Sequence, residues 1–260
     1  MFKHKQADGD GTQTAAEELR NKGYVVLQAV HSLPTIEAAR ATILEQRGLL
    51  RNTRPTASSG HRAGFHRLPA LEPLHSLVSR PLQIRAVLDA AVGGKGVRTV
   101  GLSDITMNRS QGWHRDLLRG PYQGYTDQNL IWNSLHGVLF KALLYLQRSN
   151  SLRLIAGSHL RRCRLDSDDD STPSDEDIID SPPVEAGDVI LMDLRMSHCG
   201  SQEKAFAVDE ARRHPKLLVS TVFGAIESPL TAQFESGNNV RQADWDRRHE
   251  GAAPPIFEVP

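Results

Sequence analysis

Residues 187–198, GDVILMDLRMSH, place a turn, an apolar run and a histidine next to one another. Gly187 and Asp188 form a turn signal, and the run Val189–Asp193 after them has the length and composition of a buried strand. We therefore expect a strand that delivers His198 to one side of a β structure. Because imidazole is the commonest metal ligand among side chains, this segment predicts one part of a metal site.

The sequence on both sides of this segment predicts a mostly β fold with flanking helices. Apolar, β-branched runs indicate further short strands, at Tyr24–Val30, Val97–Met107, Val138–Leu146, Leu152–Ile155 and Leu217–Ile226. Helical signals are concentrated in the first third of the chain, at Ala15–Lys22, from Ser32 to about Gln46, and near Leu74–Ala91. Several short strands after a helix-rich start are typical of a jelly roll or barrel with helices packed outside it.

We expect one domain, at 14–260, preceded by a disordered segment at 1–13 that is polar and rich in Gly and Asp. The Arg-, Ser- and Gly-rich stretch 51–64 is predicted to be a loop. Residues 166–183, DSDDDSTPSDEDIIDSPP, are acidic and have no hydrophobic period, so they predict a solvated surface insertion. They lack the Asp-x-Asp-x-Asp-Gly order of a calcium loop.

The composition narrows the cellular setting and the class of partner. Basic and acidic residues number 31 each, so no net field recruits nucleic acid or anionic lipid. No apolar run approaches the roughly 18 residues of a membrane span, and the first ten residues lack the apolar core of a secretory signal. Cys163 and Cys199 give no disulfide framework. We expect a cytoplasmic protein, a monomer or homodimer, that acts on a small-molecule substrate without a nucleic-acid or membrane partner.

The segment Trp113-His114-Arg115-Asp116 supplies two more candidate ligands. Side chains two residues apart in extended structure point to the same side, so His114 and Asp116 can face one metal ion together. With His198 they form a set of two histidines and one carboxylate that leaves three octahedral positions open. A non-haem iron(II) oxygenase needs this arrangement to hold a bidentate 2-oxo acid and dioxygen. The same letters begin a protein-kinase catalytic loop, but no Asp-Phe-Gly follows, so that interpretation fails.

Over roughly residues 15–226 the chain resembles the phytanoyl-CoA dioxygenase family of iron/2-oxoglutarate oxygenases. Four features match in order: LRNKGYVVL at 19–27, the His-x-Asp pair, LLYL at 143–146 with SLRLIAGSH at 151–159, and the Gly-Asp-Val strand that leads to His198. The resemblance implies a double-stranded β-helix (jelly-roll, cupin-like) core. It also implies Fe(II) held by His114, Asp116 and His198, with 2-oxoglutarate and O2 as cosubstrates. His159, in the Gly-Ser-His turn, is expected to be structural.

The resemblance further implies a cation that receives the distal carboxylate of 2-oxoglutarate. The family places an arginine just before the last predicted strand, where a guanidinium forms a bidentate, charge-assisted contact. In this chain Lys216 falls in that register when counted back from the end of the strand. Arg213 comes closer when counted forward from His198. We expect Lys216 to be the cosubstrate cation and keep Arg213 as the second candidate.

Two alternatives remain beside a small-molecule dioxygenase that hydroxylates or otherwise oxidises its substrate. The lysine in place of the family's arginine leaves open a non-catalytic jelly-roll binding protein of the same family. A cupin-type oxygenase without 2-oxoglutarate is disfavoured, because such sites usually carry three or four histidines and only two fit here. The presence of Asp116 favours oxygenation or desaturation over halogenation, since related halogenases carry a small residue at that place.

Overall fold

The computed structural model of the chain describes residues 9–51, 59–109, 111–133, 139–162, 171–200 and 214–249. Residues 1–8 of the predicted disordered segment, the first part of the predicted acidic insertion, Cys163 and Arg213 lie outside these ranges.

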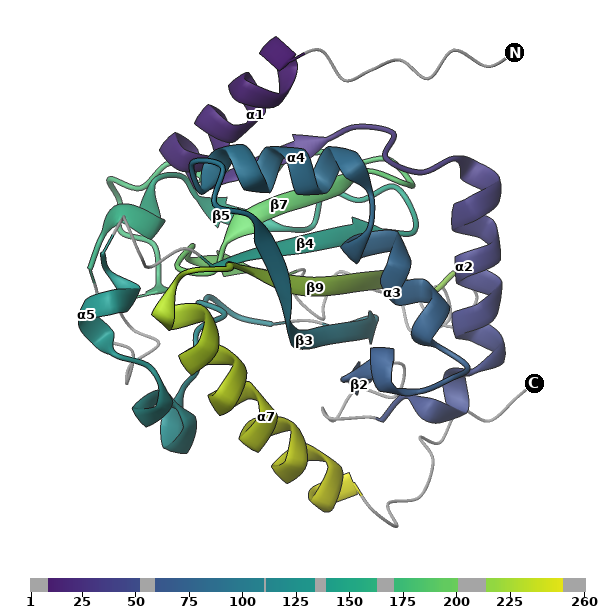
Figure 1. Ribbon diagram of the computed structural model, residues 1–260. Helices are drawn as coiled ribbons and strands as arrows, with labels where there is room; N and C mark the ends of the chain where they lie inside the picture. The colour runs from purple at the N-terminus through teal and green to yellow at the C-terminus, as the bar shows by residue number, and fades with distance from the viewer. Residues whose placement is uncertain are drawn as a thin grey trace.

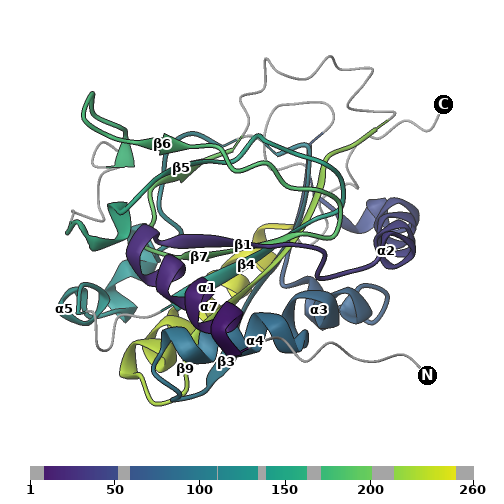
Figure 2. The same cartoon turned by 90° about the horizontal axis from the view of Figure 1, so that it is seen from above.

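Two antiparallel sheets form the centre of the fold, and they lie opposite each other in Figure 2. The larger sheet has the order β1-β7-β4-β9-β3-β2 and the smaller one β6-β5-β8. The strands of the larger sheet are β1 (Tyr24–Leu27), β2 (Gly60–Ala63), β3 (Val97–Met107), β4 (Leu139–Tyr145), β7 (Val189–Asp193) and β9 (Leu217–Ala225). Those of the smaller sheet are β5 (Arg153–Ile155), β6 (Ile179–Asp180) and β8 (His198–Cys199). This is the jelly-roll core that the strand pattern predicted, with helices flanking it.

Helices flank the larger sheet. They are α1 (Gly9–Lys22), α2 (Leu33–Glu45), α3 (Glu72–Ser79), α4 (Leu82–Ala91), α5 (Gln128–Ile131) and α7 (Pro229–His249). Short 3-10 turns lie at Arg47–Leu49, Phe65–Arg67, Gly120–Tyr125 and Ser158–Leu160. Helices α1, α3, α4 and α7 lie on the side of the sheet away from β5 and β6 (Figures 1 and 2). No helix in the parts of the chain given above is both long and apolar enough to cross a membrane.

Alternation along the strands separates the outer core from the interior between the sheets. In β4, Phe140, Ala142 and Leu144 belong to the cluster packed under the helices. Their neighbours Lys141, Leu143 and Tyr145 face the other way and line an interior cavity. Because side chains of a strand alternate between the two faces of its sheet, one strand serves both the apolar core and a polar interior.

Several sequence predictions are confirmed and others are wrong. Val97–Met107 and Val189–Asp193 have the predicted bounds. The helix predicted near Leu74–Ala91 is two helices, since Pro81 has no N–H to donate and precedes a new first turn. The loop predicted at 51–64 contains β2, and the disorder predicted at 1–13 is wrong from Gly9 on, where α1 begins.

Two further segments differ from expectation. Within the predicted acidic insertion, Ile179 and Asp180 form β6 and pair with β5, and the hydroxyl of Tyr24 donates to Asp180 at 2.7 Å. The extended structure expected at His-x-Asp is limited to an isolated bridge between His114 and His198. The predicted strand Val189–Asp193 does not itself carry His198, which lies farther along the chain on β8 of the smaller sheet.

Candidate metal centre

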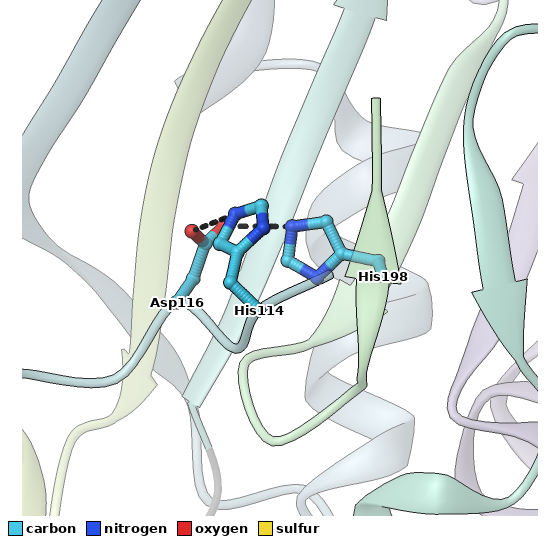
Figure 3. Close-up of side chains that lie close together, drawn as sticks. All are labelled: His114, Asp116 and His198. Carbon is cyan, nitrogen blue, oxygen red and sulfur yellow. Dashed lines mark ion pairs between the residues drawn. The ribbon is translucent and has the colours of Figure 1, made fainter. Parts of the chain in front are cut away.

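The structure brings His114, Asp116 and His198 together, with one ligand atom from each lying within 4.8 Å of the other two. Figure 3 shows their side chains converging, two from a loop and one from β8. Backbone hydrogen bonds hold the segments side by side: the N–H of His114 donates to the carbonyl of His198 at 2.9 Å, and the reverse bond is 3.0 Å. The N–H of Asp116 donates to the carbonyl of Leu194 at 3.2 Å.

A hydrogen bond from Nδ1 orients each imidazole. Nδ1 of His114 lies 2.7 Å from the carbonyl oxygen of Gly112, and Nδ1 of His198 lies 3.0 Å from that of Met196. A carbonyl only accepts, so each Nδ1 carries the proton and donates, which leaves the lone pair on Nε2. These Nε2 atoms face the carboxylate of Asp116, at 3.4 Å for His114 and 3.6 Å for His198.

The spacing of these atoms suits a metal ion. Ligand atoms about 2.1 Å from a metal in adjacent octahedral positions lie about 3.0 Å apart, so a small inward movement completes the contacts. Two imidazole nitrogens and one carboxylate form a mixed donor set that matches the facial triad of non-haem iron(II) sites. The residues present therefore fit the metal that the sequence predicted.

The protonation states are also those that metal binding needs. Burial by itself would raise the pKa of Asp116, but the neighbouring ammonium group of Lys141 holds it well below its usual value. Nζ of Lys141 donates to Oδ2 of Asp116 at 2.8 Å. Burial and the neighbouring His114 lower the pKa of His198 to about 3. At neutral pH the site thus presents a carboxylate anion and a neutral His198 imidazole, ready to ligate.

A cavity of about 690 Å³, including its open mouth, lies in front of the three residues. Its walls come from β3, β4 and β9 of the larger sheet and from residues near the smaller one. On the β4 side it is lined by Lys141, Leu143, Tyr145 and Leu152. On the β3 side it is lined by Asp104, Thr106, Arg109 and Gln111, and Lys216 lines it at the start of β9.

Lys216 lines the cavity, and its role in binding 2-oxoglutarate stays a prediction. Its backbone is fixed on both sides by Asn108, whose N–H donates to the Lys216 carbonyl at 2.9 Å and whose Oδ1 accepts from the Lys216 N–H at 2.8 Å. Its ammonium group donates to the hydroxyl of Ser151 and lies 5.7 Å from the ring centre of Tyr145. Burial lowers the pKa of Lys216 to about 8. Among the residues that the structure describes, no carboxylate pairs with this cation.

Three polar groups of the site were missed by sequence reasoning. Lys141 interrupts an apolar strand, which was a readable signal, since a charge at one inward position of a buried strand needs a partner. Asp104 and His61 form a buried pair at 3.2 Å. Their pairing depends on the alignment of β2 with β3, which the sequence does not show.

His159 is placed as expected, away from the three candidate ligands. Its Nε2 bonds to the carbonyl of Arg20 at 2.9 Å, which ties the Gly-Ser-His turn to the end of α1. A Cβ built on Gly23, which has a φ of +89°, would lie 2.5 Å from Nδ1 of His159 and 2.1 Å from Sδ of Met196. The histidine is thus part of a tight contact that needs glycine at the turn between α1 and β1.

No protein-family model matches the chain, and no curated protein matches it. Solved structures do. The non-heme, alpha-ketoglutarate-dependent epimerase SnoN from nogalamycin biosynthesis has a TM-score of 0.62 at 16% identity, over 84% of each chain. The carbocyclase SnoK of the same pathway, also described as non-heme and alpha-ketoglutarate dependent, has a TM-score of 0.60 at 21% identity, over 81% of this chain and 83% of SnoK. EctD from S. alaskensis, solved with 2-oxoglutarate and 5-hydroxyectoine, has a TM-score of 0.60 at 17% identity, over 87% of this chain and 81% of EctD. At these identities the chain is shown to share their fold.

Proposed function

We propose that this protein is an Fe(II)/2-oxoglutarate-dependent dioxygenase of the phytanoyl-CoA dioxygenase type that oxidises a small molecule. The observation that carries the proposal is the cluster of His114, Asp116 and His198 sharing one cavity with the ammonium group of Lys216, which no carboxylate of the described residues pairs with. The fold it shares with SnoN, SnoK and EctD, whose descriptions name alpha-ketoglutarate, also called 2-oxoglutarate, adds support.

The proposed roles follow from the geometry of the side chains. His114, Asp116 and His198 would hold Fe(II), and Lys216 would receive the distal carboxylate of 2-oxoglutarate. Bound iron supplies activation of O2 coupled to the oxidative decarboxylation of 2-oxoglutarate. Ser151 holds the ammonium of Lys216 in place, and burial raises the pKa of Tyr145, so its phenol stays protonated near the same carboxylate. Leu143, Leu152 and Leu218 make the walls around them apolar, which excludes water.

The proposal fixes the reaction class and leaves the final product open. The same fold serves an epimerase and a carbocyclase among the proteins compared above. We therefore propose oxidation at a C–H bond, with Asp116 retained as an anionic ligand and hydroxylation or desaturation as the outcome.

The decisive experiment measures iron content and succinate. Protein reconstituted with Fe(II) without oxygen is expected to bind one equivalent of iron and, on admission of O2, to release succinate from 2-oxoglutarate. His198→Ala is expected to lose the iron. His214→Ala, which changes an exposed histidine close to β9, is the matched control and should keep it. A fully loaded His198→Ala protein would contradict the assignment, and wild-type protein that binds no iron would favour the non-catalytic jelly-roll protein.

A further inference from the structure

A second carboxylate faces the cavity, on the far side of β9 from the proposed 2-oxoglutarate position. Asp104 of β3 is 9% exposed and lines the cavity. It pairs across the sheet with Ser220 of β9, which in turn pairs with Leu143 of β4. The ammonium of Lys216 instead points to Ser151 and Tyr145, on the β4 side. The two charges therefore border different parts of the same space.

Within the described part of the chain, the carboxylate of Asp104 has one hydrogen-bond partner, His61. Its Oδ1 lies 3.2 Å from Nε2 of His61 on β2, whereas Oδ2 accepts no hydrogen bond from any residue that the structure describes. Burial would raise the pKa of Asp104, but the hydrogen bond with His61 and the charges of Lys141 and Arg241 lower it, so the group is ionised. Burial lowers the pKa of His61, which as a neutral ring donates a single N–H. A buried anion with one donor is incompletely satisfied, because a carboxylate accepts about four hydrogen bonds.

The nearby cations Lys141 and Arg241 donate their hydrogen bonds to residues other than Asp104. Lys141 donates to Asp116 at 2.8 Å, and it acts on Asp104 through its charge without a hydrogen bond. Arg241, on α7, donates to Asn238 at 3.0 Å. Arg109 and Gln111 line the same side of the cavity. The cavity thus presents a carboxylate whose Oδ2 accepts no hydrogen bond from the described residues.

We infer that Asp104 binds a protonated amine, so that the cavity accepts an amine-bearing small molecule. This inference rests on the proposed function, since it takes the cavity beside the three candidate ligands as the substrate pocket. An ammonium brings an opposite charge and three N–H donors to this buried anion, whereas a hydroxyl brings one O–H donor and no charge, so the ammonium satisfies it better.

Neighbouring side chains hold the carboxylate of Asp104 in one orientation, as a ligand-binding group requires. His61 has its ring edge against Trp245 of α7, with centroids 6.1 Å apart, and Arg62 lies over the same indole at 5.0 Å. The C-terminal helix therefore fixes the histidine that fixes Asp104. A carboxylate held in this way needs little ordering when a ligand binds.

The test compares probes that differ in one group. Protein loaded with Fe(II) and 2-oxoglutarate under nitrogen is titrated with cyclohexylmethylamine, cyclohexylmethanol and cyclohexanecarboxylate, and binding is followed by calorimetry or ligand-observed NMR. The amine is expected to bind at least tenfold more tightly than either matched probe. Asp104→Asn is expected to weaken amine binding at least tenfold and to leave alcohol binding unchanged. Asp175→Asn, which neutralises an exposed carboxylate, should behave as the wild type.

Equal binding of amine and alcohol, no amine binding by the wild type, or an unchanged amine affinity in Asp104→Asn would each overturn the inference. If Asp104→Asn does not fold, the inference is judged by whether the wild-type protein prefers the amine to the other two probes. The variant Asp104→Glu must then show the same preference. Iron and 2-oxoglutarate binding are measured on the same samples. Their loss in the wild type contradicts the proposed function, whereas a lost amine preference with both still bound contradicts this inference alone.

Discussion

Replacing Lys216 by methionine should weaken the binding of 2-oxoglutarate by a factor of roughly 300. Burial lowers the pKa of this lysine from 10.5 to about 8. At about 1.36 kcal/mol per pKa unit, the charged form of Lys216 is about 3 kcal/mol less stable in the cavity than in water. A bound carboxylate can supply this stabilisation again. This value lies within the roughly 2–5 kcal/mol lost when one partner of a buried charge pair is removed. Methionine keeps the length of the side chain, so packing against Tyr145 should be retained.

The assay is calorimetric titration of 2-oxoglutarate into iron-loaded protein without oxygen. Lys95→Met, which changes an exposed lysine, is the matched control and should bind as the wild type does. The binding constant should also depend on pH. Because the free protein loses the Lys216 proton near pH 8, affinity should be constant below about pH 7.5 and fall as pH rises from 8 toward 9.5. A larger loss in Arg213→Ala than in Lys216→Met would refute the assignment of the cation, as would affinity independent of pH.

Three further predictions concern the stability of the fold. Lys141→Met leaves the carboxylate of Asp116 buried without its 2.8 Å partner, at a cost of about 3–5 kcal/mol. Iron should therefore raise the melting temperature of this variant more than that of the wild type in calorimetric scans, and an equal or smaller rise would contradict the pairing. The pKa of His198 is lowered to about 3, so the unfolded chain binds more protons than the folded one between pH 3 and 6.5. The free energy of unfolding in urea should fall as pH drops through that window, and His198→Gln should flatten the dependence; an unchanged slope would show that His198 is not buried as a neutral ring. Gly23→Ala should destabilise the fold by about 1–3 kcal/mol, because the φ of +89° and the contact with Met196 both exclude a methyl group. Wild-type stability in urea for this variant would contradict the tight turn.

The segments that were predicted correctly are those whose own length and composition determine their structure. Val189–Asp193 is apolar throughout and is buried throughout in the structure, so its length and composition sufficed. The three candidate ligands were found because two lie in one short motif and the third follows that strand. Lys216 was proposed through a resemblance; it lines the same cavity, and its role stays a prediction.

The segments that were missed depend on contacts between distant parts of the chain. Gly60–Ala63 has no strand-like composition and becomes β2 by pairing with β3, which in turn places His61 beside Asp104. Helix α7 was missed because its buried side includes Asn238 and Gln242, so its sequence lacks a clear apolar stripe. Such polar positions are buried only once their partners are in place.

The reciprocal bonds between the backbones of His114 and His198 make the geometry of the site independent of the ion it would hold. Both bonds, at 2.9 and 3.0 Å, use main-chain atoms, so they persist whatever the side chains bind. Zinc-finger peptides gather their ligands only as the metal binds, and stripping the metal unfolds them. Here the chain has already closed the long loop between its two histidines during folding. Uptake of a metal would then be a local, repeatable exchange, and a chelator would leave behind a folded protein able to reload.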